Sequence, residues 1–169
     1  MSTSKPTRVF AFIGAMLFFV TSCALTAVVV WQIHQDKKPP IQQIKETKLE
    51  GKPLANFTPI SKIDKLSSTD TVVGTGQEVK EGDTITAHYT GAVASSGIVF
   101  QSSHDTGAPV TFSLSGVIKG WQQGVPGMKV GGTRRLLIPA DLAYGPAERP
   151  GIPANSDLVF DIELVSIGK

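Results

Sequence analysis

Aromatic side chains from scattered positions form the most prominent candidate functional set of this chain. Six of them lie in separate segments: Tyr89, Phe100, Phe112, Trp121, Tyr144 and Phe160. Large apolar side chains that carry a hydroxyl or an indole N–H can line a pocket for an apolar ring and still bind its polar groups. They can also simply pack a core, which is our expectation for Phe112. For the others the sequence leaves both interpretations open.

The residues needed for covalent or acid–base catalysis do not form a recognisable constellation. The chain has no Gly-x-Ser-x-Gly sequence, a single cysteine at Cys23, and three dispersed histidines. An acid–base pair needs two titratable groups brought together, whereas Asp141, Asp157 and Glu163 are expected to cap turns or to face solvent. We therefore expect no cofactor and no metal site.

The charge balance argues against a nucleic-acid partner. Among 169 residues, 16 Lys and Arg oppose 14 Asp and Glu, which gives a formal net charge of +2. Proteins that bind phosphate backbones usually carry a marked basic excess.

Residues 9–31 form an uncharged, mostly apolar run. About 20 apolar residues, each rising about 1.5 Å along a helix, cross the hydrocarbon core of a bilayer, so we predict a transmembrane or signal-anchor helix. Lys5 and Arg8 precede the run, and the basic residues after it are accompanied by Asp36. This slight bias favours a cytoplasmic N-terminus. We expect a single-pass membrane protein with an extracytoplasmic domain.

Two alternatives for this run stay open. One is a cleaved secretory signal, although the apolar run continues to Trp31, longer than is usual for such signals. The other is a lipoprotein signal, because the residues from Val20 to Cys23 resemble a bacterial lipobox, with the lipid on Cys23 after cleavage. All three interpretations export the same domain.

Four segments are expected along the chain: a tail over 1–8, the apolar helix over 9–31, a flexible tether over 32–57 and one folded domain over 58–169. The tether mixes Lys, Glu, Gln and Pro with few large apolar residues, a composition that buries too little surface to fold alone.

Alternating apolar and polar residues predict an antiparallel sheet with one buried face. The alternation is clearest at Ile85, Ala87 and Tyr89, and it recurs over 110–114 and 158–164.

Three more elements complete the predicted domain. Strands are expected over 134–138 and over 60–66, the latter as a first or edge strand. Apolar residues at helical spacing predict a short helix over 117–125, which Pro126 ends. The resulting fold class is α+β, with a sheet wrapped on one helix.

Ordered motifs make this domain similar to a known family. They are VGTG (73–76), EGDTITAHYTG (81–91), VFQSS (99–103), VIKGWQQGVPGMKVGG (117–132), LAYGP (142–146) and RPGIPANSDLVFDIEL (149–164). Over residues 58–169 the chain resembles the FKBP-type peptidyl-prolyl cis-trans isomerases, the macrolide-binding immunophilins. The resemblance implies an antiparallel half-barrel of five to six strands wrapped on one short helix.

The resemblance also implies a role for each pocket residue. Trp121 is expected to be the floor beneath the proline ring of the substrate. The walls would be Tyr89, Phe100, Val117, Ile118 and Phe160. The Tyr144 hydroxyl and the Ile118 backbone N–H are expected to donate to the substrate, and Ile152 to lie in the loop over the site.

Three positions depart from the family pattern. Gln101 stands in the catalytic set where the family usually has an aspartate at the pocket rim. Val110 replaces a second aromatic wall residue and is expected to widen the pocket. The segment before Val117 is shortened, which leaves Gly116 where compact human members have an acidic residue.

The expected activity is acceleration of X–Pro bond rotation in exported or membrane-proximal polypeptides, without a covalent intermediate. The expected partners are proline-containing clients, macrolide ligands and the membrane. A non-catalytic module that holds proline segments, or a chaperone, is the alternative function.

Overall fold

The computed structural model describes residues 48–168. The strands are β1 (Ser67–Val72), β2 (Thr84–Val93), β3 (Val99–Ser102), β4 (Val110–Ser113), β5 (Thr133–Ile138) and β6 (Leu158–Gly168), and the helix is α2 (Lys119–Gly124). Short 3-10 turns lie at η1 (Ser103–Asp105), η2 (Leu114–Gly116) and η3 (Ala140–Leu142).

The segments expected at 1–8 and 9–31, and the tether as far as residue 47, lie outside the described residues. From residue 48 to residue 168, no helix has the length and apolar character needed to cross a membrane.

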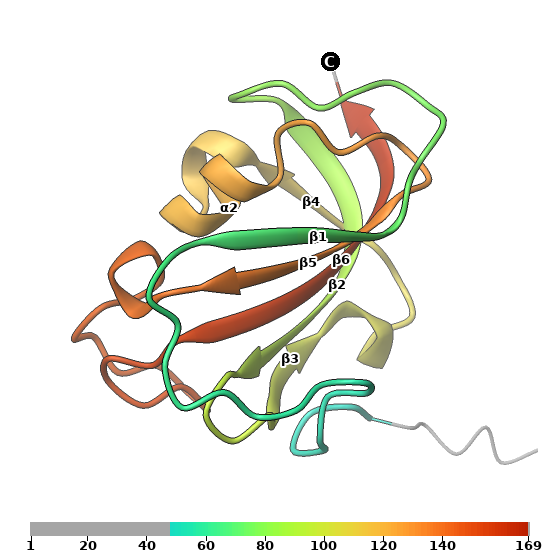
Figure 1. The fold of residues 1–169 in the computed structure, drawn as a ribbon. Helices are drawn as coiled ribbons and strands as arrows, with labels where there is room; N and C mark the ends of the chain where they lie inside the picture. Colours follow the sequence, from blue (N-terminus) through green and yellow to red (C-terminus); the bar gives the residue numbers. More distant parts are fainter. Residues whose placement is uncertain (1–47, 169) are drawn as a thin grey trace, which may run out of the picture. The chain divides into compact units, whose positions relative to one another are not determined.

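The strands form one six-stranded sheet in the order β1-β5-β6-β2-β3, with β4 also paired to β2. All pairings are antiparallel. The start of β2 pairs with β4 and its end pairs with β3, so these two short strands lie at opposite ends of β2 (Figure 1). The predicted α+β fold of about six antiparallel strands and one short helix is confirmed.

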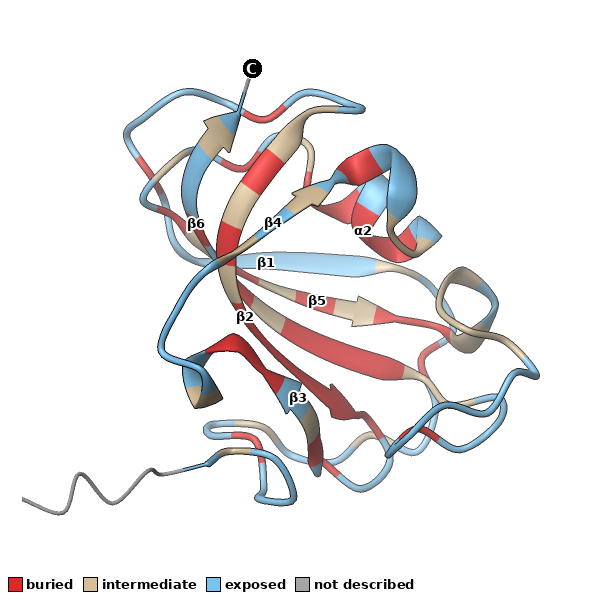
Figure 2. Cartoon of the chain, turned by 180° about the vertical axis from the view of Figure 1, so that it is seen from behind, coloured by how far each residue is buried: buried red, intermediate tan, exposed pale blue. Residues whose placement is uncertain are grey.

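The core lies between the central strands and α2. Figure 2 shows buried residues concentrated on β2, β5 and β6, whereas β1 is exposed along its length. Alternation on β5 buries Arg134, Leu136 and Ile138 on one face. This burial explains why the alternating pattern predicted the central strands.

Two glycines let α2 approach the sheet closely. A Cβ at Gly120 would lie 2.8 Å from Ile138 Cδ1, and one at Gly124 would lie 2.9 Å from Leu136 Cδ2. Real side chains do not pack this closely, so a larger residue would push the helix away from β5. The glycines therefore set the position of the helix that carries Trp121.

The prediction of a strand over 60–66 was wrong. The first strand is β1, and the preceding residues bond to loops: the Ile60 N–H donates to the Ala94 carbonyl at 2.9 Å and the Ile63 N–H to Asp157 Oδ2 at 2.7 Å. The helix is also shorter than expected, because Ile118 and Val125 are its cap residues.

The end of the expected tether is part of the folded unit. The Gly51 N–H donates to the Val99 carbonyl at 2.8 Å, the Val99 N–H donates to the Lys52 carbonyl at 2.9 Å, and the Leu54 N–H donates to the Gly97 carbonyl at 2.8 Å. Leu54 is buried. The few apolar residues of this segment suffice because the sheet supplies the rest of the contact surface. Residues 48–57 thus differ from the flexible spacer we expected.

Candidate active site

A cavity of about 250 Å³ is bounded by α2, by several strands and by the loop after η3. We call it the central cavity. Its lining residues are Tyr89, Gln101, Phe112, Gly116, Val117, Ile118, Trp121, Tyr144 and Phe160. Most are aromatic or aliphatic, as in pockets for small apolar groups.

Trp121 is the most constrained residue of the central cavity. It is 3% exposed, and its ring meets three others edge to face, with centroid distances of 5.8 Å to Tyr89, 5.3 Å to Phe112 and 5.4 Å to Phe160. Such pairs each contribute roughly 0.5–1.5 kcal/mol beyond area burial. The indole plane is therefore held from several sides.

The Trp121 indole nitrogen is an exception to the usual pairing of buried polar groups. Nε1 is buried and has no hydrogen-bond partner among the described residues. Leaving a buried donor unpaired destabilises a fold by about 1–3 kcal/mol. Natural proteins break such rules mainly at functional sites.

Gly91 on β2 makes room for two phenyl rings. A Cβ at this position would lie 2.6 Å from Phe100 Cζ and 2.6 Å from Phe160 Cε1. The two rings contact each other edge to face, with centroids 5.7 Å apart. The glycine of the HYTG sequence therefore allows both rings to pack over the strand.

Two phenols supply polar groups to the central cavity. Tyr89 is 8% exposed, and burial raises the pKa of its hydroxyl, with a smaller contribution from the neighbouring Tyr144. The phenol consequently stays protonated and able to donate at neutral pH. Tyr144 is partly exposed, and the Arg149 guanidinium lies 5.6 Å from its ring centroid.

Ile118 presents its backbone at the start of α2. Its carbonyl accepts from the N–H groups of Trp121 at 2.9 Å and Gln122 at 3.2 Å. None of the backbone hydrogen bonds found over residues 48–168 uses the Ile118 N–H. The first N–H groups of a helix lack intrahelical acceptors, so this donor is available to a ligand.

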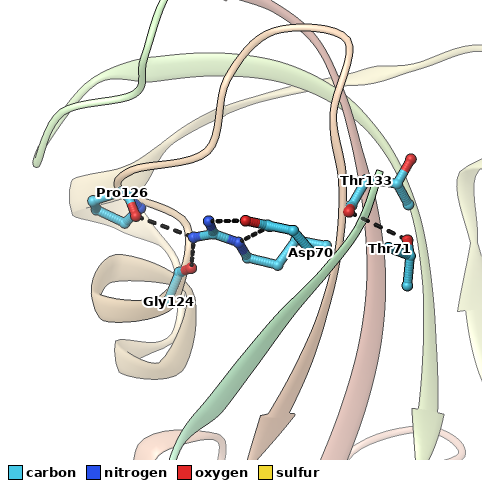
Figure 3. Close-up of polar contacts among 6 residues, drawn as sticks. Asp70, Thr71, Gly124, Pro126 and Thr133 are labelled. Carbon is cyan, nitrogen blue, oxygen red and sulfur yellow. Dashed lines mark hydrogen bonds and ion pairs between the residues drawn. The ribbon is translucent and has the colours of Figure 1, made fainter. Parts of the chain in front are cut away.

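Arg134 holds the other end of the same helix (Figure 3). Its Nε donates to Asp70 Oδ1 at 2.5 Å and its Nη2 to Asp70 Oδ2 at 3.0 Å, while Nη1 donates to the carbonyls of Gly124 at 2.9 Å and Pro126 at 3.2 Å. The hydrogen bond from Arg134 lowers the pKa of Asp70 against the opposing effect of burial. Arg134 therefore ties the end of α2 to β1.

The structure brings most of the predicted site residues together. Those that line the central cavity are Tyr89, Gln101, Val117, Ile118, Trp121, Tyr144 and Phe160. Phe100 and Ile152 instead line a neighbouring hollow, which also contains Gln101 and Tyr144.

Val110 does not line the central cavity, contrary to our expectation. It packs against the core where it pairs with Ala87, and Phe112 takes a place among the lining residues. Sequence reasoning missed Phe112, although period two places it on the same strand face as Val110. The expected widening at Val110 is therefore offset by an aromatic wall two residues away.

The remaining polar chemistry of the described region is sparse. Over residues 48–168, no group of three or more His, Cys, Asp or Glu side chains is arranged to hold a metal ion. Gln101 is exposed at the rim of the central cavity.

The part of the chain that contains the cavity residues matches a known protein family. The model of the FKBP-type peptidyl-prolyl cis-trans isomerase family matches residues 75–165, which include every residue that lines the central cavity. Peptidyl-prolyl cis-trans isomerase FPR2 of Saccharomyces cerevisiae is 54% identical over 89 residues, covering 51% of this chain and 66% of the relative.

Two further similarities involve a bacterial relative and a solved structure. The FKBP-type isomerase FkpA of Escherichia coli is 44% identical over 108 residues, covering 61% of this chain and 40% of the relative. The chain thus spans less than two thirds of the length of either of these relatives. The crystal structure of AtFKBP13 superposes with a TM-score of 0.55 at 42% identity, covering 61% of this chain and 93% of that one.

Proposed function

Because this chain belongs to the FKBP-type peptidyl-prolyl cis-trans isomerase family, we propose that its central cavity binds a prolyl residue and accelerates rotation about the preceding X–Pro bond. The observation that carries the proposal is the aromatic cavity built on Trp121, with the Tyr144 hydroxyl and the Ile118 N–H beside it.

The chemistry of the reaction suits such a cavity. Amide resonance creates a rotation barrier of about 18–20 kcal/mol, and X–Pro bonds interconvert over tens to hundreds of seconds. Rotation breaks no covalent bond and moves no proton. The enzyme needs only to bind the twisted amide more tightly than the planar one.

Two properties of the central cavity favour the twisted amide. The apolar walls disfavour the charge-separated resonance form that keeps the planar amide rigid. Donors placed for the twisted geometry, the Tyr144 hydroxyl and the Ile118 N–H, stabilise it further in a site with little water. Trp121 holds the pyrrolidine ring while the preceding carbonyl rotates.

An isomerisation assay on proline-containing peptides tests the proposal with the full-length chain. We expect a rate well above the uncatalysed one, and a lower kcat/KM after Trp121→Leu. The control is Glu81→Gln, which changes an exposed residue outside the central cavity. A rate equal to the uncatalysed one at high enzyme concentration contradicts the proposal.

A second candidate function is retention of proline segments without turnover, as a binding module or chaperone. Gln101 favours it, because a neutral amide at the rim exerts a weaker field on the rotating carbonyl than a carboxylate does. Gln101→Asp discriminates the two functions. A large gain in rate indicates a site adapted to holding, and an unchanged or lower rate indicates an enzyme that does not need the carboxylate.

The cellular context of the proposal rests on the apolar run at 9–31. We propose that this run anchors the chain in a membrane and that the isomerase domain acts outside the cytoplasm on exported polypeptides. Protease added to intact cells is then expected to digest the domain. Protection of the domain until the membrane that anchors residues 9–31 is itself permeabilised would contradict this topology.

The family resemblance also supports binding of macrolides in the central cavity. We expect FK506 to compete with the prolyl peptide for the central cavity. Inhibition of peptide isomerisation that rises with FK506 concentration measures this, and the absence of inhibition at saturating drug argues against it.

A further inference from the structure

A second hollow adjoins the central cavity. Its volume is about 540 Å³, and it shares Gln101 and Tyr144 with the central cavity. Its other lining residues are Glu50, Phe100, Arg149, Pro150 and Ile152. We call it the side groove. The two hollows share two lining residues, and consecutive Cα atoms of a polypeptide are about 3.8 Å apart. With a proline in the central cavity, we therefore expect a residue next to it to enter the side groove.

Glu50 enters the side groove from a segment that precedes the sheet. Asp105 Oδ1 accepts from the Leu49 N–H at 2.6 Å and Asp105 Oδ2 accepts from the Glu50 N–H at 3.1 Å. Immediately after these residues, the Gly51 N–H donates to the Val99 carbonyl. The backbone of Glu50 is therefore held against η1 and β3, which keeps this residue among those that line the side groove.

The Glu50 carboxylate already pairs with a cation of the same chain. Lys48 Nζ lies 2.7 Å from Glu50 Oε2, and the two side chains are 64% and 52% exposed. The hydrogen bond and charge of Glu50, and to a smaller degree the charge of Asp105, raise the pKa of Lys48. An exposed pair of this kind is screened by water and contributes little to stability. An incoming ammonium or guanidinium group can replace Lys48 at little cost.

The side groove also contains a positive charge. Among the residues that line the side groove, Arg149 is the only other one with a charge. Its guanidinium lies over the Tyr144 ring, 5.6 Å from the centroid, which is the geometry of a cation–π contact. This contact holds the positive charge of Arg149 beside Tyr144 without neutralising it. A cation in the side groove is therefore favoured where it lies nearer to Glu50 than to Arg149.

We propose that Glu50 makes the side groove a subsite for a basic side chain next to the proline. The segment that precedes the sheet then selects substrates of the isomerase, which means that this inference rests on the proposed function. The ligand class is a lysine or arginine residue adjacent to proline in a polypeptide.

Peptides that differ only in the residue next to proline test the subsite. The full-length chain, in an uncharged detergent, is compared on lysine, alanine and glutamate peptides by exchange NMR, with the variable residue placed before or after proline. We expect kcat/KM for the lysine peptide to exceed that for alanine by about two- to fivefold at low salt. The ratio falls to about one in Glu50→Gln and rises in Lys48→Gln, which removes the competing cation.

The control is Glu81→Gln, which removes an exposed carboxylate outside both hollows and should keep the lysine-to-alanine ratio. A ratio that is equal in the native chain and in Glu50→Gln overturns the inference. So does a preference for the glutamate peptide that disappears in Arg149→Gln.

Binding of the same peptides separates this inference from the proposed isomerase function. Kd values come from chemical-shift titrations of the same samples. A lysine preference that Glu50→Gln abolishes supports the subsite even where no peptide is isomerised, in which case only the catalytic proposal fails. Equal Kd values for the three peptides overturn the subsite whether or not turnover occurs.

Discussion

The two ends of α2 treat their polar groups in opposite ways. At the start, the Ile118 N–H takes part in no backbone hydrogen bond within the described part of the chain, and the nearby Trp121 indole nitrogen is buried without a partner there. At the end, the carbonyls of Gly124 and Pro126 accept from Arg134. Along this one short helix, the donors that can bind a ligand lie at the start, and the hydrogen bonds that stabilise the fold lie at the end.

This separation matters because α2 cannot stand alone. Isolated helices shorter than about 12–15 residues are marginal in water, and α2 runs only from Lys119 to Gly124. Its position depends on the glycine contacts with β5 and on Arg134. The start of the helix can keep unpaired donors because Arg134 bonds two carbonyls at its other end.

The largest effect is expected from removing the hydrogen bonds at the end of α2. Arg134→Met leaves Asp70 and two backbone carbonyls without their donor, and we expect the free energy of unfolding to fall by about 2–4 kcal/mol. Urea denaturation measures the loss. The exposed Lys129→Met serves as the control. A loss no larger than that of the control would show that Arg134 does not hold the helix.

A smaller effect is expected from filling the contact between α2 and β5. Gly120→Ala places a methyl group against Ile138, so we expect about 1–3 kcal/mol of destabilisation and a lower kcat/KM as Trp121 shifts. Gly116→Ala is the matched control for stability, because a Cβ there meets nothing within 4 Å. Equal stability of the two variants would refute the close-approach argument.

A substitution beside the start of α2 should lower the activity and leave the stability of the fold unchanged. Tyr144→Phe removes one hydroxyl that no described residue binds, and we expect kcat/KM to fall roughly two- to tenfold with an unchanged urea midpoint. The peptide exchange assay and urea denaturation on one sample measure both. A large loss of stability without a loss of activity would reverse the assignment of the two ends.

The smallest expected effect is a pH dependence at Asp70. Its folded pKa is lowered by Arg134, so the unfolded chain binds the proton more readily, and stability present above the unfolded pKa of about 3.9 is lost as pH falls through the folded value. Because the Asp70 side chain is 35% exposed, solvent screens its charge and the protonation effect is at most about 1 kcal/mol. We expect the fall in unfolding free energy between neutral and acidic pH to be larger in the native chain than in Asp70→Asn. Identical slopes would mean that the pair contributes nothing.

Sequence periodicity predicted β2, β4, β5 and β6 but missed β1 and the four-residue strand β3. Burial alternates along all of β5 and along parts of β2 and β6, because one face of these segments packs against the core. The whole of β1 is exposed, so no alternation marks it. Residues 60–66 carry spaced apolar side chains, yet their main chain bonds to loops, which no local pattern records.

The sequence predicted site residues that lie in local motifs. It did not predict contacts between residues that are far apart along the chain. Period two already places Arg134 on the buried face with Leu136 and Ile138, and a buried charge needs a partner. That this partner is Asp70, 64 residues earlier, is a property of the β1–β5 register. The position of Glu50 depends likewise on Asp105 and β3, which no spacing within the first 57 residues reveals.

The docked segment at 51–54 has a consequence for self-association. β3 ends the strand order of the sheet, and an uncovered edge strand invites pairing with another chain and aggregation. Residues 51–54 occupy the free side of β3 through hydrogen bonds to Gly97 and Val99. Removal of residues 1–54 would therefore expose unpaired backbone groups at the edge of β3. Light scattering on a concentrated solution of the truncated protein should detect the resulting oligomers.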